Sequence, residues 1–349
     1  MMSAGSSGCG GPAVQQAPDP AHPAPSPRMA SAPRRLRGVR AHLAGAGADG
    51  PAPLAPLAPD TQAFMDVLAA MPVPDEEPPL AVRRAGFDAM LGQQSEWGID
   101  ASAVTCAEVT TPADGDSPPV PTRVYSAPGE GDKPVLLYFH GGGWTQGTAE
   151  AYGPFTAALC ARGGFHVVSV EYRLAPEHPA PAASDDCFAV LKWLADGGEG
   201  SGLSLDSSRI ALAGDSAGGH LTLVTAIAAR DAGIPIAVQV PLCPVTDCRL
   251  GPQRRGTSFE HFAEGFLLTE VNMGWFIDNY LPDEADREQD WRVSHSHPQS
   301  PPLFLPRCKM QYKCLERQRR EPRLLSTIDS LGPPQQCSTA ALDSTPHAK

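Results

Sequence analysis

No stretch of this 349-residue sequence reaches the roughly 18 consecutive apolar residues that mark a membrane-spanning helix. Positive charge is also scarce, because 27 Lys and Arg are outnumbered by 39 Asp and Glu and the net charge is −12. Nucleic acids and anionic lipid surfaces are bound by basic faces. The composition therefore predicts no membrane span and no nucleic-acid partner.

A disulfide framework is missing as well. The nine cysteines are odd in number and irregular in spacing, and free thiols in a reducing cytoplasm are the simplest interpretation. The first 27 residues lack an apolar signal-peptide core, while an arginine-rich, acid-free segment from Met29 leaves an organelle transit peptide as an alternative. Neither H-E-x-x-H nor G-x-x-x-x-G-K occurs, so we expect no metal and no other cofactor.

Three regions of the chain differ in composition. Residues 1–57 are rich in Pro, Ala and Gly without periodicity, and we expect them to be disordered. Residues 58–294 carry the apolar periodicity of a folded domain. In residues 301–349 eight Lys or Arg outnumber four Asp or Glu, and no strand-like run occurs. We therefore expect residues 295–349 to form a disordered tail outside the domain.

Apolar patterns within the middle region predict an α/β fold. Amphipathic segments at 60–71 and 78–92 predict two helices. Four short apolar segments predict strands: 135–139, 165–172, 209–214 and 237–245. Because helical patterns separate these strands, they indicate a parallel sheet covered on both faces, with functional loops at the carboxyl ends of the strands.

A serine in a glycine-flanked turn lies between one of these strands and a helix. The segment R-I-A-L-A-G-D-S-A-G-G-H-L, residues 209–221, contains G-x-S-x-G centred on Ser216. Small residues at Gly214 and Gly218 allow the tight strand-to-helix turn that exposes a nucleophilic hydroxyl, and the helix start beneath offers free N–H groups. Ser216 is the predicted nucleophile.

A second glycine-rich segment, Y-F-H-G-G-G-W at 138–144, follows the strand 135–139. Attack on an ester carbonyl places negative charge on oxygen, which converging backbone N–H groups stabilise by about 3 kcal/mol each. We expect Gly141 and Gly142 to donate two of these hydrogen bonds and Ala217 a third, with His140 organising the loop. The sequence thus predicts an oxyanion hole beside Ser216.

These two motifs occur together with E-Y-R-L-A-P-E-H-P (171–179), L-C-P-V-T-D (242–247) and Y-L-P-D-E-A-D-R-E-Q-D-W-R-V-S (280–294). From about residue 60 to Ser294 the chain resembles the hormone-sensitive-lipase-like group of α/β-hydrolase esterases. The resemblance implies an α/β-hydrolase fold with an N-terminal helical cap and hydrolysis of small carboxylic esters. It also implies that Ser216 is the nucleophile and that the oxyanion loop runs from His140 through Gly143. Three further residues are expected to brace the neighbouring loop: Tyr172, Arg173 and Glu177.

The rest of a catalytic triad is not evident in the sequence. In this fold an acid and then a histidine follow the serine, but the family's D-x-L-x-D and H-G-F strings are absent. Asp215 points away across the turn, and His220 points along the helix. The remaining candidates follow Ser294: His295, His297, His347, Glu316, Glu321, Asp329 and Asp343. Without further strands the segment 237–243 would also be an unpaired sheet edge, prone to aggregation.

An aromatic-rich helical segment at 258–281 is too apolar for a solvated linker, and either a core helix or a lid over an apolar pocket would explain it. The expected pocket and lid residues are Trp144, Phe262, Phe266, Leu267 and Trp275. The sequence thus predicts a serine carboxylesterase that acts on small-molecule esters with short-to-medium acyl chains. The alternative is a catalytically dead remnant without the triad acid and base. The oligomeric state cannot be predicted from these features.

Overall fold

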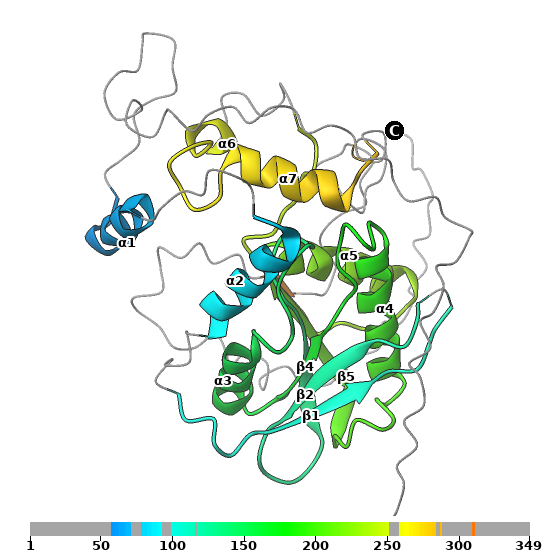
Figure 1. Cartoon of the computed structure of the whole chain (residues 1–349). Coiled ribbons are helices and arrows are strands. Elements are labelled where there is room, and N and C mark those ends of the chain that lie inside the picture. The colour runs from blue at the N-terminus through cyan, green and yellow to red at the C-terminus, as the bar shows by residue number, and fades with distance from the viewer. Residues whose placement is uncertain are drawn as a thin grey trace, which may run out of the picture. The chain divides into compact units, whose positions relative to one another are not determined.

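A computed structural model describes residues 57–70, 78–92, 99–115, 117–250, 258–283, 287 and 309–310 (Figure 1). All of them belong to one compact unit, Ala46–Lys349. The helices are α1 (Pro59–Ala70), α2 (Leu80–Gly92), α3 (Gly153–Gly163), α4 (Ala182–Ala195), α5 (Ala217–Asp231), α6 (Ser258–His261) and α7 (Glu270–Tyr280). The strands are β1 (Thr105–Thr110), β2 (Pro121–Ser126), β3 (Lys133–Phe139), β4 (His166–Val170), β5 (Leu205–Asp215), β6 (Val238–Leu242) and β7 (Lys309–Met310).

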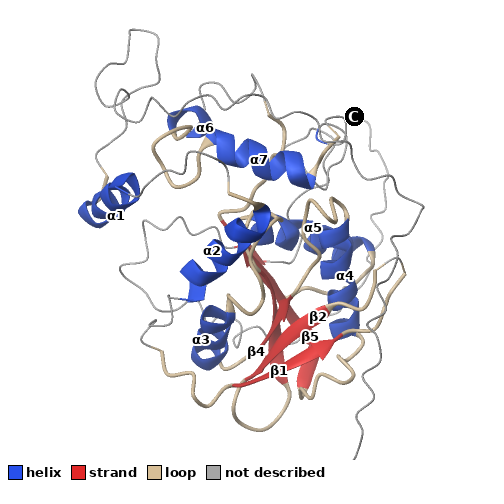
Figure 2. Ribbon diagram, in the orientation of Figure 1, coloured by secondary structure: helices blue, strands red, loops and turns tan. Residues whose placement is uncertain are grey.

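The strands form one mixed sheet in the order β1-β2-β4-β3-β5-β6-β7. The pairs β1–β2 and β2–β4 are antiparallel, whereas β4, β3, β5, β6 and β7 run parallel to one another. Helices cover the parallel part on both faces (Figure 2). The predicted α/β architecture with a doubly covered parallel sheet is therefore confirmed.

Burial on both faces of the sheet explains why residues 135–139 of β3 form an apolar run. Val135, Leu137 and Phe139 point into a core shared with α4 and α5, and all three are buried. Leu136 and Tyr138 point into a second core on the opposite face, beside residues of α3 such as Cys160. Because successive side chains alternate between two dry faces, a polar residue is disfavoured at every position. This arrangement makes β3 a rigid support for the loop that follows it.

The sheet edge at β6 differs from the sequence-based expectation. Strand β7 pairs in parallel with Val238 and Gln239 of β6. The prediction that segment 237–243 lacks a neighbouring strand is therefore wrong for these two residues. Because β7 comes from within residues 295–349, that region contributes a short strand to the sheet.

The state of the cysteines and the hydropathy of the helices bear on two expectations drawn from the composition, free thiols and no membrane span. The described cysteines Cys106, Cys160, Cys187, Cys243 and Cys248 are all free thiols. Among the helices described in the structure, none combines the length and hydropathy needed to cross a membrane.

Candidate active site

The two predicted motifs start from adjacent points on the sheet. Phe139, the last residue of β3, is the register partner of Gly214 near the end of β5. Because the strands are parallel, the loop at His140 and the turn at Ser216 leave the same edge side by side. The end of β6 joins them, since the N–H of Ser216 donates to the carbonyl of Leu242 at 2.8 Å. Three strand ends therefore surround the candidate nucleophile.

Ser216 occupies a strained turn between β5 and α5. Its φ of 54° and ψ of −117° lie in a region that non-glycine residues rarely adopt. The strain is the price of a reversal sharp enough to leave the side chain at the top of the sheet. The carbonyl of Ser216 already accepts the first helical hydrogen bond of α5, from the N–H of His220 at 3.0 Å.

The flanking glycines are required by backbone packing. A Cβ at Gly214 would lie 2.5 Å from the carbonyl oxygen of Phe139, and a Cβ at Gly218 would lie 2.6 Å from that of His140. Both contacts are with the backbone at the end of β3, which cannot rotate away as a side chain could. Small residues at these positions therefore bring α5 and the serine turn against the glycine-rich loop.

Asp215 fastens the glycine-rich loop to the serine turn. Its carboxylate accepts hydrogen bonds from the hydroxyl of Tyr138 at 2.7 Å, from the hydroxyl of Tyr152 at 2.8 Å and from the N–H of Gly141 at 3.0 Å. Burial raises the pKa of Asp215, and these donated hydrogen bonds oppose the rise. The side chain thus acts as a clamp on the loop.

This clamp corrects one expected role. The N–H of Gly141, predicted to donate to an oxyanion, is occupied by Asp215 and by Tyr152 Oη at 3.1 Å. The N–H groups of Gly142, Gly143 and Ala217 have no acceptor within the described part of the chain. Gly142 and Gly143 have φ values of 119° and 60°, which glycine adopts without strain. In this loop the available amides are therefore those of Gly142 and Gly143, rather than the predicted Gly141 and Gly142.

His140 is buried and organises the loop, as expected. Its Nδ1 donates to the carbonyl of Gly141 at 2.8 Å, and its ring stacks on Tyr172 with centroids 4.2 Å apart. The hydroxyl of Tyr172 donates to the His140 carbonyl at 2.7 Å. Burial lowers the pKa of His140 from 6.5 to about 4. Protonation is disfavoured because it would place an N–H on the buried Nε2, which has no partner among the described residues.

The lowered pKa of His140 predicts that acid destabilises the fold. Between pH 6.5 and 4 the unfolded chain binds a proton that the folded chain excludes, so stability falls as the pH drops through this window. The slope from this group approaches about 1.4 kcal/mol per pH unit. Urea unfolding at pH 7, 6 and 5 measures it, and the His140→Asn variant is expected to show a shallower dependence. Identical pH dependence in both proteins would contradict the assignment.

Trp144 does not line a pocket as predicted. It is fully buried, stacks on Tyr280 of α7 with ring centroids 4.4 Å apart, and donates from Nε1 to His220 Nδ1 at 3.3 Å. His220 is buried as well, which agrees with its predicted packing role. The expected substrate contact of Trp144 is therefore corrected: the indole connects the glycine-rich loop to α5 and α7.

The segment 258–281 combines a packed half and an exposed half. Phe262 and Phe266 contact each other at 4.8 Å between centroids, Leu267 is 61% exposed, and the guanidinium of Arg83 lies 4.3 Å from the ring centroid of Trp275. Sequence reasoning missed Phe276, whose ring lies where a Cβ of Gly143 would be. Its spacing of four residues from Tyr280 was the available signal, because such residues share a helix face.

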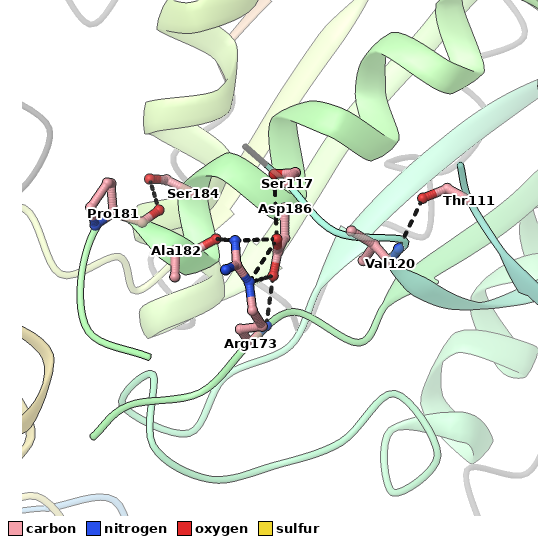
Figure 3. A network of polar contacts seen from close by, with 8 residues as sticks. All are labelled: Thr111, Ser117, Val120, Arg173, Pro181, Ala182, Ser184 and Asp186. Carbon is pink, nitrogen blue, oxygen red and sulfur yellow. Dashed lines mark hydrogen bonds and ion pairs between the residues drawn. The ribbon is translucent and has the colours of Figure 1, made fainter. Parts of the chain in front are cut away.

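The loop after β4 is braced by an ion pair between a partly buried arginine and a buried aspartate (Figure 3). Asp186 of α4 is 1% exposed and accepts hydrogen bonds from Arg173 Nε at 2.9 Å, Arg173 Nη2 at 2.8 Å and the Arg173 N–H at 2.9 Å. The hydroxyl of Ser117 lies 3.5 Å from the same carboxylate. This network confirms the predicted structural role of Arg173.

The partners that a serine nucleophile needs are not found in the described structure. In the described ranges, the hydrogen bonds of the His140, His166 and His220 rings go to partners other than the hydroxyl of Ser216. The acids and histidines predicted as candidates after Ser294 all lie outside the described residues. The described ranges also contain no group of three or more His, Cys, Asp or Glu side chains that could hold a metal ion.

Comparison with known proteins identifies relatives of this chain. A family model described as alpha/beta hydrolase fold matches residues 136–312, and so extends past Ser294. The chain is 37% identical over 185 residues to the carboxylic ester hydrolase LipN of Mycobacterium tuberculosis, covering 52% of this chain and 48% of that protein. It is 41% identical over 165 residues to the carboxylesterase NlhH of the same species, covering 47% and 50%. The chain thus spans about half the length of the curated relatives it matches.

A solved esterase structure shares the fold. The esterase of Pyrobaculum calidifontis superposes with a TM-score of 0.59 at 32% sequence identity, covering 69% of this chain and 74% of that one.

Proposed function

Because the chain belongs to the alpha/beta-hydrolase-fold family, in its hormone-sensitive-lipase-like esterase group, we propose that it is a serine hydrolase of the carboxylesterase type. Its substrates are small carboxylic esters with short-to-medium acyl chains. The observation that carries the proposal is the register match of Phe139 with Gly214, which starts the amide-rich loop and the serine turn side by side.

In the proposed reaction, Ser216 Oγ adds to the carbonyl carbon of the ester and loses its proton to a general base. The bond to the alcohol then breaks, the alcohol leaves with that proton, and the acyl group remains on Ser216. Water attacks the acyl-enzyme, releases the carboxylic acid and restores the serine hydroxyl.

Gly142, Gly143 and Ala217 are proposed to stabilise the negative oxygen in both steps. Their N–H groups are free within the described residues, and Ala217 lies at the amino end of α5, where the helix dipole also favours negative charge. Loss of one such donor typically lowers kcat by about 10²- to 10³-fold.

The apolar side chains of the 258–281 segment support the choice of acyl chain. Phe262, Leu267, Leu268 and Val271 are between 40% and 73% exposed, and Phe276 contacts the oxyanion loop. We propose that Phe262, Phe266, Leu267 and Trp275 form the lid side of the acyl site. An apolar chain would remove such surface from water, at about 25 cal/mol for each Å² buried.

The second candidate is a folded chain without catalytic activity. It is favoured by the hydrogen bonds of the His140, His166 and His220 rings, which in the described ranges go to partners other than the hydroxyl of Ser216. Turnover of p-nitrophenyl butyrate by the purified full chain separates the two proposals. Turnover well above the spontaneous rate supports the esterase, and a folded protein that gives no turnover and no acyl-enzyme by mass spectrometry supports the inactive alternative.

A further inference from the structure

We propose that Arg84, on the N-terminal helix α2, is a positioning residue that sets the aim of the oxyanion loop. This inference rests on the proposed function and deepens it, because it assigns a role to a helix far in sequence from both catalytic motifs. Arg84 precedes the loop by about sixty residues, and its side chain is 27% exposed.

The guanidinium of Arg84 joins three separate groups. Its Nε donates to the carbonyl of Thr145 at 2.7 Å, and its Nη2 donates to the carbonyl of Ala175 at 3.1 Å. Nη1 and Nη2 also donate to the two carboxylate oxygens of Glu177, at 2.8 Å and 2.7 Å. A planar fork with fixed donor directions can satisfy such a set at once, whereas a single ammonium cannot.

The carbonyl of Thr145 lies at the far end of the amide-rich turn. The N–H groups of Thr145 and Gln146 donate to the carbonyl of Gly142 at 3.2 Å and 3.1 Å, which closes the turn that contains Gly143. The N–H of Ala175 donates to the carbonyl of Trp144 at 2.9 Å. Arg84 therefore holds both Thr145 and the residue that supports Trp144.

The near end of the same loop is held by Asp215, through the N–H of Gly141. The Gly142 and Gly143 amides thus lie between two anchors, one on the serine turn and one on α2. Releasing the α2 anchor lets the turn rotate about the Asp215 anchor. Such rotation would misdirect the amides without removing any group that touches the substrate.

Glu177 orients the guanidinium rather than the loop. It contacts Arg84 with both oxygens, and the hydrogen bonds from Arg84 lower the pKa of Glu177. Its own side chain is 51% exposed, so the pair is screened by water and contributes little to the stability of the fold by itself. Replacing Glu177 should therefore loosen Arg84 without removing the contacts to the two carbonyls.

The neighbouring residue Arg83 contacts α7, which in turn packs against the loop. Its guanidinium lies over Trp275, and the next residue, Phe276, packs on Gly143. Two consecutive arginines of α2 thus contact the two elements that border the candidate oxyanion site. This arrangement links the position of α2 to the geometry of the loop.

The test compares Arg84→Ala, Arg84→Lys and Glu177→Gln in the full chain, with Val82→Ala as the control. Val82 lies on the same helix and is 58% exposed. Kinetics with p-nitrophenyl butyrate give kcat and KM, and hydrogen exchange measured by mass spectrometry reports on the amides of Thr145, Gln146 and Ala175.

We expect Arg84→Ala to lower kcat by about 10- to 100-fold with KM within about twofold, because oxyanion donors act mainly in the transition state. Arg84→Lys and Glu177→Gln should fall between this variant and the wild type. Hydrogen exchange at Thr145, Gln146 and Ala175 should rise most in Arg84→Ala and by a smaller amount in the other two variants. Val82→Ala should match the wild type in both measurements.

Exchange rates and kcat in Arg84→Ala equal to those of Val82→Ala would overturn the proposal. A rise in KM that equals the loss in kcat/KM would also overturn it, because that result describes ground-state binding. If the wild-type chain gives no turnover, the proposed esterase function fails, while the exchange comparison still decides whether Arg84 holds the loop.

Discussion

Replacing Ser216 with alanine is expected to lower the turnover of p-nitrophenyl butyrate by about 10⁴- to 10⁶-fold, the range seen when a serine nucleophile is removed. The hydroxyl has no substitute, because the acyl-enzyme forms on its oxygen. Only binding and the Gly142, Gly143 and Ala217 amides would remain, and these supply a small residual rate. Initial rates of the purified wild-type and variant chains measure the effect.

Ser208→Ala is the matched control for this experiment. Ser208 lies on the same strand, β5, and is exposed, and its hydrogen bonds are local: its N–H and its hydroxyl both donate to the carboxylate of Asp206, at 2.9 Å and 2.5 Å. It should turn over substrate like the wild type. Equal rates in Ser216→Ala and Ser208→Ala would show that another group performs the reaction, and the assignment of the nucleophile would be wrong.

Replacing Gly218 with alanine is expected to destabilise the fold by about 3 kcal/mol or more, as overpacking against a rigid neighbour does. Helix propensity alone predicts the opposite sign, because alanine is favoured over glycine in a helix by about 1 kcal/mol. The added methyl, however, meets the carbonyls of Phe139 and His140, which belong to the backbone and cannot yield. The free energy of unfolding in urea measures the change.

Gly86→Ala provides the comparison, since Gly86 also lies within a helix but a Cβ there meets no atom within 4 Å. This variant should be as stable as the wild type or more so by about 1 kcal/mol. A Gly218→Ala chain as stable as Gly86→Ala would show that α5 does not pack against the end of β3 in the way described.

Much of the fold follows from local patterns. The strand from 135 to 139 could be predicted because two-sided burial requires a continuous apolar run, and because this run is too short for a typical helix. The amphipathic period of the segments between the strands predicts the helices. The serine turn could be predicted for a similar reason, since Gly214 and Gly218 are needed wherever the backbone reverses so closely. These requirements act within a few residues, and the sequence displays them directly.

The site was harder to predict at atomic detail. The motif H-G-G-G indicates an amide-rich loop, but it does not show which amides are free. The N–H of Gly141 is engaged by Asp215, which lies 74 residues later, and by Tyr152, which lies 11 residues later. The ring of Trp144 likewise stacks on Tyr280, which lies 136 residues later in the sequence. Partners of this kind depend on how strands and helices cross in space.

The sequence by itself determined the α/β class, the strand-to-helix turn at Ser216 and the glycine-rich loop after β3, because each depends on short-range backbone geometry and burial. Only the tertiary structure decided which amides of that loop face outward, that α7 covers it through Phe276, and that Arg84 anchors its far end. Those features arise from contacts between segments far apart in the chain. Their geometry depends on the packing of the whole domain, which no local pattern encodes.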